Sequence, residues 1–155
     1  MTIAKPSKDS NLLPLQKKQF LSLNNLLFAL LPCLLLASLL GTYLDLYFTG
    51  KEMYSFPKRL LPDIFSIHIG FTLVVLPALT AAFLVVCYRI SFGQKVCFIL
   101  FFSLLMSFSE KQAEGFGFFI HHPSWKHLYS FIGFNLYLTS LYLLFHFLIR
   151  QLNKK

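Results

Sequence analysis

Apolar stretches separated by short polar segments make up most of the chain. Three of them, at 26–44, 64–88 and 128–149, carry no charged residue apart from histidine. A helix needs about 20 mostly apolar residues to cross a hydrocarbon core about 30 Å thick. The pattern therefore predicts membrane-spanning helices at about 26–46, 64–88 and 128–149.

A further span is predicted from a shorter stretch. Residues 96–108 are apolar and are followed by the charged segment 109–114 and by apolar residues at 115–120. At 1.5 Å per residue, the first part alone extends only about 20 Å. A segment that stopped inside the bilayer would leave unpaired backbone groups in lipid unless protein covered them. We therefore expect one helix through the charged segment, at about 96–120.

The basic residues divide unevenly among the connections. The leader 1–25, the connection 89–95 and the tail 150–155 hold nine bases and one acid, whereas the other two connections hold five of each. Lys and Arg accumulate on the cytoplasmic side of membrane proteins. The expected fold is therefore an all-α, polytopic integral membrane protein, with four transmembrane helices in a single bundle at 26–149. Both the N-terminus and the C-terminus are expected to be cytoplasmic.

Composition supports the membrane class and excludes several others. Of 155 residues, 56% are hydrophobic and only 13% are charged, too few polar groups to cover a small soluble domain. The net charge of +8 is dispersed over short segments between apolar runs. We therefore expect the lipid bilayer and a membrane-protein partner or second copy, not nucleic acid, as partners. Cys33, Cys87 and Cys97 lack paired spacing and are expected to pack as small apolar side chains.

The span expected at 96–120 carries a polar stripe. At 100° per residue, a sector about 80° wide contains six side chains: Ser103, Ser107, Glu110, Glu114, Gly117 and His121. A charged side chain within a span costs about 2.5–3.5 kcal/mol, so it usually faces protein or water. The other predicted spans also place polar groups in the outer half of the bilayer. We predict an outward-facing polar cavity with five residues in or near its wall: Glu110, Glu114, His68, Asp45 and Asn135.

The same residues also have a purely structural interpretation. Glu110 and Glu114 can form salt bridges with Lys111 or with bases of the neighbouring loops. His68 can be a packed, hydrogen-bonded histidine near the membrane interface. The two interpretations require different tertiary contacts.

A histidine-rich segment occupies 121–127. His121, His122 and His127 are candidate metal ligands, because imidazole commonly binds zinc and copper. Their spacing matches no metal-binding motif, and Pro123 ends any helix after His122. We therefore expect histidines of an aromatic interfacial turn, with neither a bound metal nor another cofactor.

Three segments carry a resemblance to a known family: Gly41-Thr42-Tyr43-Leu44-Asp45-Leu46-Tyr47-Phe48, Tyr54-Ser55-Phe56-Pro57-Lys58-Arg59, and Glu110-Lys111-x-x-Glu114 to Trp125-Lys126-His127-x-Tyr129-Ser130. Here the chain resembles small polytopic membrane proteins of spore-forming Gram-positive bacteria, over about residues 26–149. The resemblance implies a multi-pass protein of the bacterial cytoplasmic membrane with four or five spans. It implies no activity and no catalytic residue.

Three functions fit these observations. The small size and the lack of a catalytic or nucleotide-binding motif favour a non-catalytic accessory or interaction protein of the cell membrane. A small proton-coupled transporter would use Glu110, Glu114 and His68 as protonatable groups. An intramembrane lipid- or isoprenoid-modifying enzyme would use Glu110 as general acid or base, with His68 as its partner.

Overall fold

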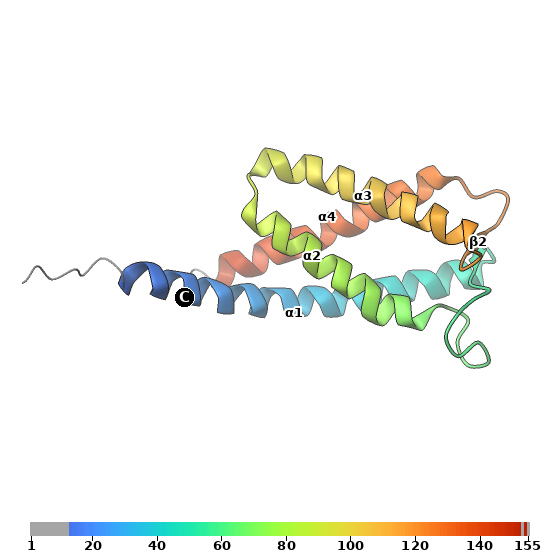
Figure 1. The fold of residues 1–155 in the computed structure, drawn as a ribbon, viewed down its shortest axis with the longest axis horizontal. Helices are drawn as coiled ribbons and strands as arrows, with labels where there is room; N and C mark the ends of the chain where they lie inside the picture. Colours follow the sequence, from blue (N-terminus) through green and yellow to red (C-terminus); the bar gives the residue numbers. More distant parts are fainter. Residues whose placement is uncertain (1–12, 153, 155) are drawn as a thin grey trace, which may run out of the picture.

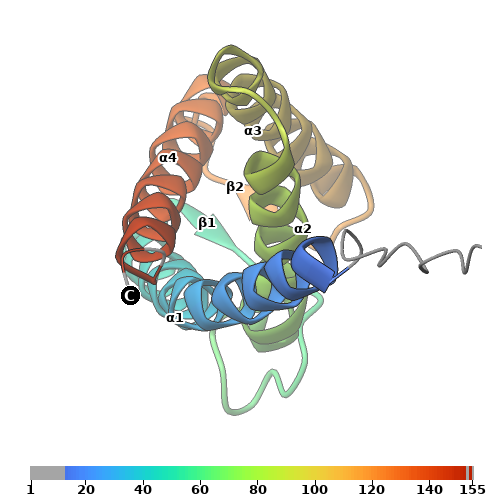
Figure 2. The same cartoon turned by 90° about the vertical axis from the view of Figure 1, so that its left-hand side faces the viewer.

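The computed structural model describes residues 13–152 and 154. Its elements in chain order are α1 (Leu13–Gly50), β1 (Tyr54–Ser55), the π-helical turn η1 (Phe71–Val75), α2 (Leu76–Arg89), α3 (Phe92–Gly115), β2 (Ile120–His121) and α4 (His127–Leu152). Within the described residues, four helical stretches are long and apolar enough to cross a membrane. The predicted all-α four-helix bundle is confirmed, and the chain is a membrane protein (Figure 1, Figure 2).

The observed helix limits differ from the predicted ones most in three places. α1 begins at Leu13, inside the predicted leader. The second span begins with the π-helical turn at Phe71, not near residue 64, and α3 ends at Gly115, not near residue 120. Residues 1–12 of the predicted leader, and residues 153 and 155 of the predicted tail, lie outside the described residues.

Arg59 holds the chain before η1 in a loop. Its guanidinium donates hydrogen bonds of 2.6 to 3.1 Å to three carbonyl oxygens: those of Phe56, Pro62 and Phe65. Ile67 is buried against aromatic side chains outside the bundle core. Because Arg59 and Ile67 anchor this segment, residues 64–68 stay in the loop although three of the five are apolar.

α3 ends early because Gly117 turns the chain. Gly117 has a φ of +73°, a left-handed conformation that glycine adopts without strain. The amide of Phe118 donates a hydrogen bond to the carbonyl of Ala113 at 3.0 Å, which closes the last turn. Lys58 Nζ donates to the carbonyl of Phe116 at 3.0 Å. The residues that follow therefore form β2 instead of a further helical turn.

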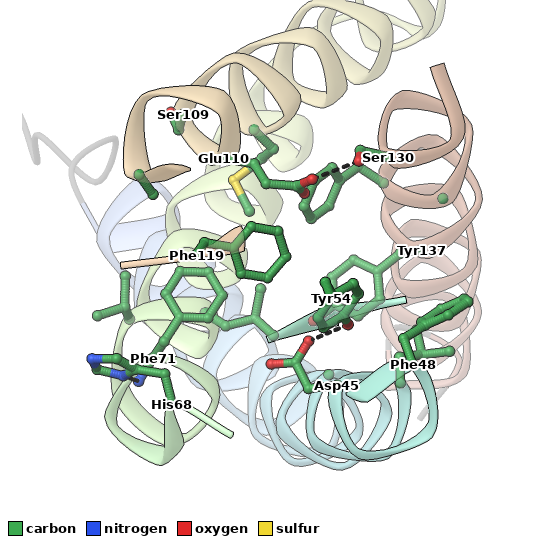
Figure 3. A pocket seen from close by; sticks show the side chains of 18 of the residues that line it. Asp45, Phe48, Tyr54, His68, Phe71, Ser109, Glu110, Phe119, Ser130 and Tyr137 are labelled. Carbon is green, nitrogen blue, oxygen red and sulfur yellow. Dashed lines mark hydrogen bonds between the residues drawn. The ribbon is translucent and has the colours of Figure 1, made fainter. Parts of the chain in front are cut away.

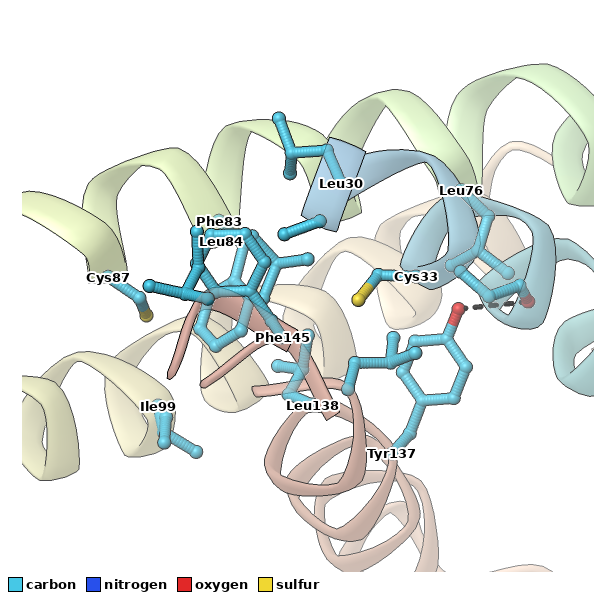
Figure 4. Close-up of a cluster of buried hydrophobic side chains, with 14 of the residues drawn as sticks. Leu30, Cys33, Leu76, Phe83, Leu84, Cys87, Ile99, Tyr137, Leu138 and Phe145 are labelled. Carbon is cyan, nitrogen blue, oxygen red and sulfur yellow. Dashed lines mark hydrogen bonds between the residues drawn. The ribbon is translucent and has the colours of Figure 1, made fainter. Parts of the chain in front are cut away.

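A stripe of small residues on α1 lets other helices approach closely. Ala29, Cys33, Ala37 and Gly41 recur at every fourth position, and all four are buried. Tyr137 of α4 donates a hydrogen bond to the carbonyl oxygen of Ala37 at 3.1 Å (Figure 4). α1 packs against α2 and α4, whereas α3 packs mainly against α4. Small residues allow this close backbone approach, which drives helix association where the hydrophobic effect does not.

The main buried core lies between these helices. Phe83, Leu84 and Leu138 are almost fully buried in it (Figure 4). Cys33 and Cys87 are buried in the same cluster, whereas Cys97 is exposed on α3. The expected packing as small apolar side chains therefore holds for two of the three cysteines.

The two short strands join the helical hairpins at one end of the bundle. β1 and β2 pair antiparallel, with Tyr54 opposite His121. A second buried cluster covers this pair and contains Phe56, Ile67 and Phe119. We call this end of the bundle, formed by residues 51–70 and 116–126, the strand end. The C-terminus lies at the opposite end (Figure 1).

Candidate functional site

A cavity of about 770 Å³ lies in the half of the bundle next to the strand end, with walls from all four helices. Most of its lining side chains are Phe, Leu, Met and Val. The lining residues with a hydroxyl or ionisable group are Asp45, Tyr54, His68, Ser109, Glu110, Tyr129, Ser130 and Tyr137 (Figure 3). A largely apolar pocket of about 300–1,000 Å³ with a few converging polar groups is typical of ligand-binding sites.

Asp45 reaches the cavity because of its position on α1. It follows Ala37 and Gly41 at four-residue spacing, so it continues the inward-facing stripe. The hydroxyl of Tyr54 donates a hydrogen bond to Asp45 Oδ1 at 2.8 Å. Burial raises the pKa of Tyr54 far above its usual range, and the charge of Asp45 raises it further. Tyr54 therefore stays protonated and remains a donor.

Glu110 extends into the cavity from the opposite wall, on α3 (Figure 3). Its Oε1 accepts a hydrogen bond from Ser130 Oγ at 2.6 Å. Ser130 Oγ in turn accepts one from Trp125 Nε1 at 3.0 Å. His121 Nε2 lies 2.7 Å from the same Glu110 oxygen. These contacts use one carboxylate oxygen, and a carboxylate offers about four acceptor positions.

His121 lies between two glutamates. Its Nδ1 is 3.2 Å from Glu114 Oε2, and its backbone amide donates to Glu114 Oε1 at 3.2 Å. The imidazole stacks on Trp125, with ring centroids 5.3 Å apart. Burial by itself would lower the pKa of His121, but the adjacent carboxylates of Glu110 and Glu114 outweigh it and raise this pKa. The two carboxylates therefore favour the imidazolium form of His121.

The structure brings together part of the residue set predicted for the cavity. Three of the five residues line it: Asp45, His68 and Glu110. Glu114 turns instead toward His121 beside the cavity. Asn135 lies on α4 outside the lining, and its Nδ2 atom is buried without a hydrogen-bond partner among the described residues. The structural interpretation names Lys111 or bases of the outer loop as partners of the glutamates; in the structure the ring nitrogens of His121 lie 2.7 Å and 3.2 Å from Glu110 and Glu114 instead.

The sequence predicts His68 inside the second helix, but in the structure it lies outside that helix. It precedes η1, and its Nδ1 accepts a hydrogen bond from the amide of Phe71 at 3.1 Å. The same amide also donates to the carbonyl oxygen of His68 at 2.9 Å, so the two acceptors of His68 share one donor. η1 itself comes just before Pro77, which has no N–H for a regular helical hydrogen bond. The cavity wall beside His68 is therefore an irregular helix.

Side-chain atoms of the types that ligate metals lie close together beside the cavity. One donor atom from each of Glu114, His121 and His127 lies within 4.8 Å of the others. His122 is not part of this cluster, and its Nδ1 lies 2.8 Å from Ser124 Oγ. Of the three histidines that the sequence offers as ligands, the fold brings together two, and it adds a carboxylate.

Three residues that hold the site together carry no signal in the sequence pattern: Tyr54, Ser130 and Trp125. They are ordinary interfacial residues by type, and only the fold places them against Asp45 and Glu110. Comparisons of the chain with protein-family models, with curated proteins and with solved structures find no match. The function therefore has to be inferred from the site itself.

Proposed function

We propose that this protein is a non-catalytic membrane protein that binds an amphiphilic ligand in the cavity next to the strand end. The observation that carries this proposal is a cavity of about 770 Å³ in which two carboxylates face apolar walls. The ligand's chain would pack against Phe, Leu and Met side chains, and its head group would lie near Asp45 and Glu110. The apolar chain of a ligand that leaves the lipid gains little from the hydrophobic effect. The polar contacts of its head group would therefore provide the selectivity for the ligand.

The charges in the wall define the head group. Asp45 and Glu110 are hydrogen-bond acceptors, so a hydroxyl, amine or ammonium group would satisfy them. A phosphate would face like-charge repulsion in a low-dielectric site. Lys58 and Arg59 do not line the cavity, and both donate to backbone carbonyls of the strand end. The ligand class we propose is therefore a neutral or cationic amphiphile.

Divergence of two helices provides a route from the bilayer. α2 and α3 are joined by a short connection and separate toward the strand end (Figure 1). The cavity lining includes Val75 before α2 and Leu105 on α3, and these side chains are 45% and 43% exposed. A ligand dissolved in the bilayer would enter between the two helices.

Trp125 allows a direct test of binding. It is the single tryptophan of the chain, and it lines the cavity. The full chain in lipid nanodiscs would be titrated with dodecanol, dodecylamine and dodecyl phosphate while Trp125 fluorescence is followed. We expect a saturable change with the alcohol and the amine. Binding of the phosphate should be at least about tenfold weaker, which corresponds to about 1.4 kcal/mol.

A cavity-filling variant provides the control. Ala113 lines the cavity, so Ala113→Phe should abolish the fluorescence response. Ala78 is exposed on α2 and outside the lining, so Ala78→Phe adds the same ring without filling the cavity. A response that never saturates, or one that persists unchanged in Ala113→Phe, would contradict the proposal.

A proton-coupled carrier is a second candidate, because two protonatable carboxylates share the cavity with a π-helical turn. Such turns occur frequently at functional sites. A carrier would show pH-dependent amphiphile flux into vesicles, and Glu110→Gln would abolish that flux. Intact flux in this variant would exclude the carrier.

The enzyme alternative has less support. It pairs Glu110 with His68, but Glu110 lies beside His121, whereas His68 Nδ1 accepts the backbone amide of Phe71.

The excess of basic residues in the leader, the connection 89–95 and the tail supports an orientation in the membrane as well. With both termini cytoplasmic, the strand end would face outward from the bacterial cytoplasmic membrane. A C-terminal tag that a protease reaches from the outside of intact cells would exclude this orientation.

A further inference from the structure

A second group of residues lies beside the cavity, where three elements meet. Glu114 is near the end of α3, His121 is in β2, and His127 is the first residue of α4. One donor atom from each lies within 4.8 Å of the other two. We propose that these three residues bind a divalent transition-metal ion, with Zn²⁺ as the best match to two imidazoles and a carboxylate. This inference does not depend on the proposed amphiphile binding.

One pair of possible donor atoms already has a separation suited to a shared ion. His121 Nδ1 and Glu114 Oε2 are 3.2 Å apart. Two ligands of tetrahedral zinc, at about 2.0–2.1 Å from the metal, are separated by about 3.3 Å. The other oxygen of Glu114 accepts the backbone amide of His121 at 3.2 Å, which orients Oε2 toward the imidazole. Binding of the ion therefore requires little movement of this pair.

Glu110 supplies the outer contact that a metal-binding histidine usually has. Its Oε1 lies 2.7 Å from His121 Nε2, although the ring N–H is not aligned for a hydrogen bond with it; a carboxylate this close favours the proton on Nε2 and leaves Nδ1 as the metal-binding nitrogen. Histidines that bind metals almost always donate their other N–H to a carboxylate, carbonyl or water. The side chain of His121 is only 5% exposed, and Trp125 stacks on it. The imidazole is thus held in a fixed orientation.

His127 completes the ligand set from the solvent side. Its imidazole is 5.6 Å from that of His121 between ring centroids, and the residue is exposed. Three protein ligands leave the fourth position of a tetrahedral ion for water or another small ligand. The proposed site is therefore open on one side.

The test is the metal content of the full chain, purified in detergent through a tag that contains no histidine. After incubation with Zn²⁺ and dialysis, elemental analysis should show stoichiometric zinc in the wild type. His127→Ala should lose it, and since His127 is exposed this variant is expected to fold. His122→Ala removes a neighbouring exposed histidine outside the cluster and should retain the zinc. Glu110→Gln should weaken zinc binding about 10–100-fold, the usual effect of losing an outer contact.

Co²⁺ provides a second measurement. Tetrahedral Co²⁺ absorbs visible light, and at this site it would also quench the fluorescence of Trp125, which stacks on His121. Wild-type protein without stoichiometric zinc or cobalt, or equal metal content in His127→Ala, would overturn the proposal. The dodecylamine titration should be repeated after the metal has been removed with a chelator. Amphiphile binding in the cavity and metal content are then measured independently, so the two proposals are tested separately.

Discussion

His121 Nε2 lies 2.7 Å from Glu110 Oε1, and this contact fixes strand β2 to helix α3. Both residues are close to the cavity, but only Glu110 lines it. The same imidazole faces Glu114, so one side chain connects the cavity wall with the proposed metal site. We therefore expect the stability of the strand end to depend on the charge of His121 when no metal is bound.

The first prediction is a pH dependence of the metal-free protein. Glu110 and Glu114 raise the pKa of His121 above 6.5, and Tyr54 and His127 also face the imidazole. A histidine with a raised folded-state pKa contributes stability that is complete below the unfolded-state pKa. That contribution is lost as pH rises through the folded-state pKa. In chelator, the melting temperature of the wild type should fall as pH rises above about 6.5, and more steeply than that of His121→Asn. Parallel curves would contradict the pairing.

The second prediction concerns the charge of Glu110. Glu110→Gln keeps the size of the side chain and an oxygen that can accept from Ser130, but it removes the charge that faces His121. We expect a loss of about 1–3 kcal/mol in unfolding free energy, typical of a buried charged hydrogen bond. Chemical unfolding in detergent would measure it. Glu52→Gln, an exposed position in the loop after α1, is the matched control and should change stability little.

The third prediction concerns the partner of Asp45. Tyr54→Phe removes the hydroxyl that donates to Asp45 Oδ1 at 2.8 Å and leaves the carboxylate without that donor. The expected loss is about 1–3 kcal/mol, visible as a lower melting temperature. Tyr43 is 64% exposed and lies at the same end of α1 as Asp45. Tyr43→Phe also deletes a tyrosine hydroxyl, and it should lower the melting temperature little. Equal melting temperatures for the two variants would show that the Tyr54 contact does not contribute.

The fourth prediction tests the packing of α1 against the start of α2. A Cβ atom at Gly41 would overlap the side chain of Leu76. Gly41→Leu should therefore destabilise the bundle by about 1–3 kcal/mol through overpacking. Leu76→Ala should restore much of this loss in the double variant, because it vacates the space that the new side chain needs. Gly93→Leu is the control, since nothing lies within 4 Å of a Cβ there.

The membrane spans could be predicted from the sequence because lipid imposes a local rule. Without water, every backbone group in a span must be paired within the helix, so apolar length by itself identifies the span. The inward direction of Glu110 also follows from local periodicity, since it shares a helix face with the buried Ser103 and Ser107. These features depend only on residues a few positions apart.

The site itself was decided by contacts between distant parts of the chain. Gly117 ends α3 early, and His121 therefore returns to Glu110 and Glu114 from a strand instead of continuing the helix. Tyr54 meets Asp45 only because β1 pairs with β2. Arg59 keeps His68 outside the helix that its apolar neighbours predict. Such contacts depend on how two loops fold against each other, and hydrophobic periodicity contains no information on that packing. The sequence by itself thus determines the four-helix membrane architecture, and the tertiary structure alone decides which of its few polar groups meet.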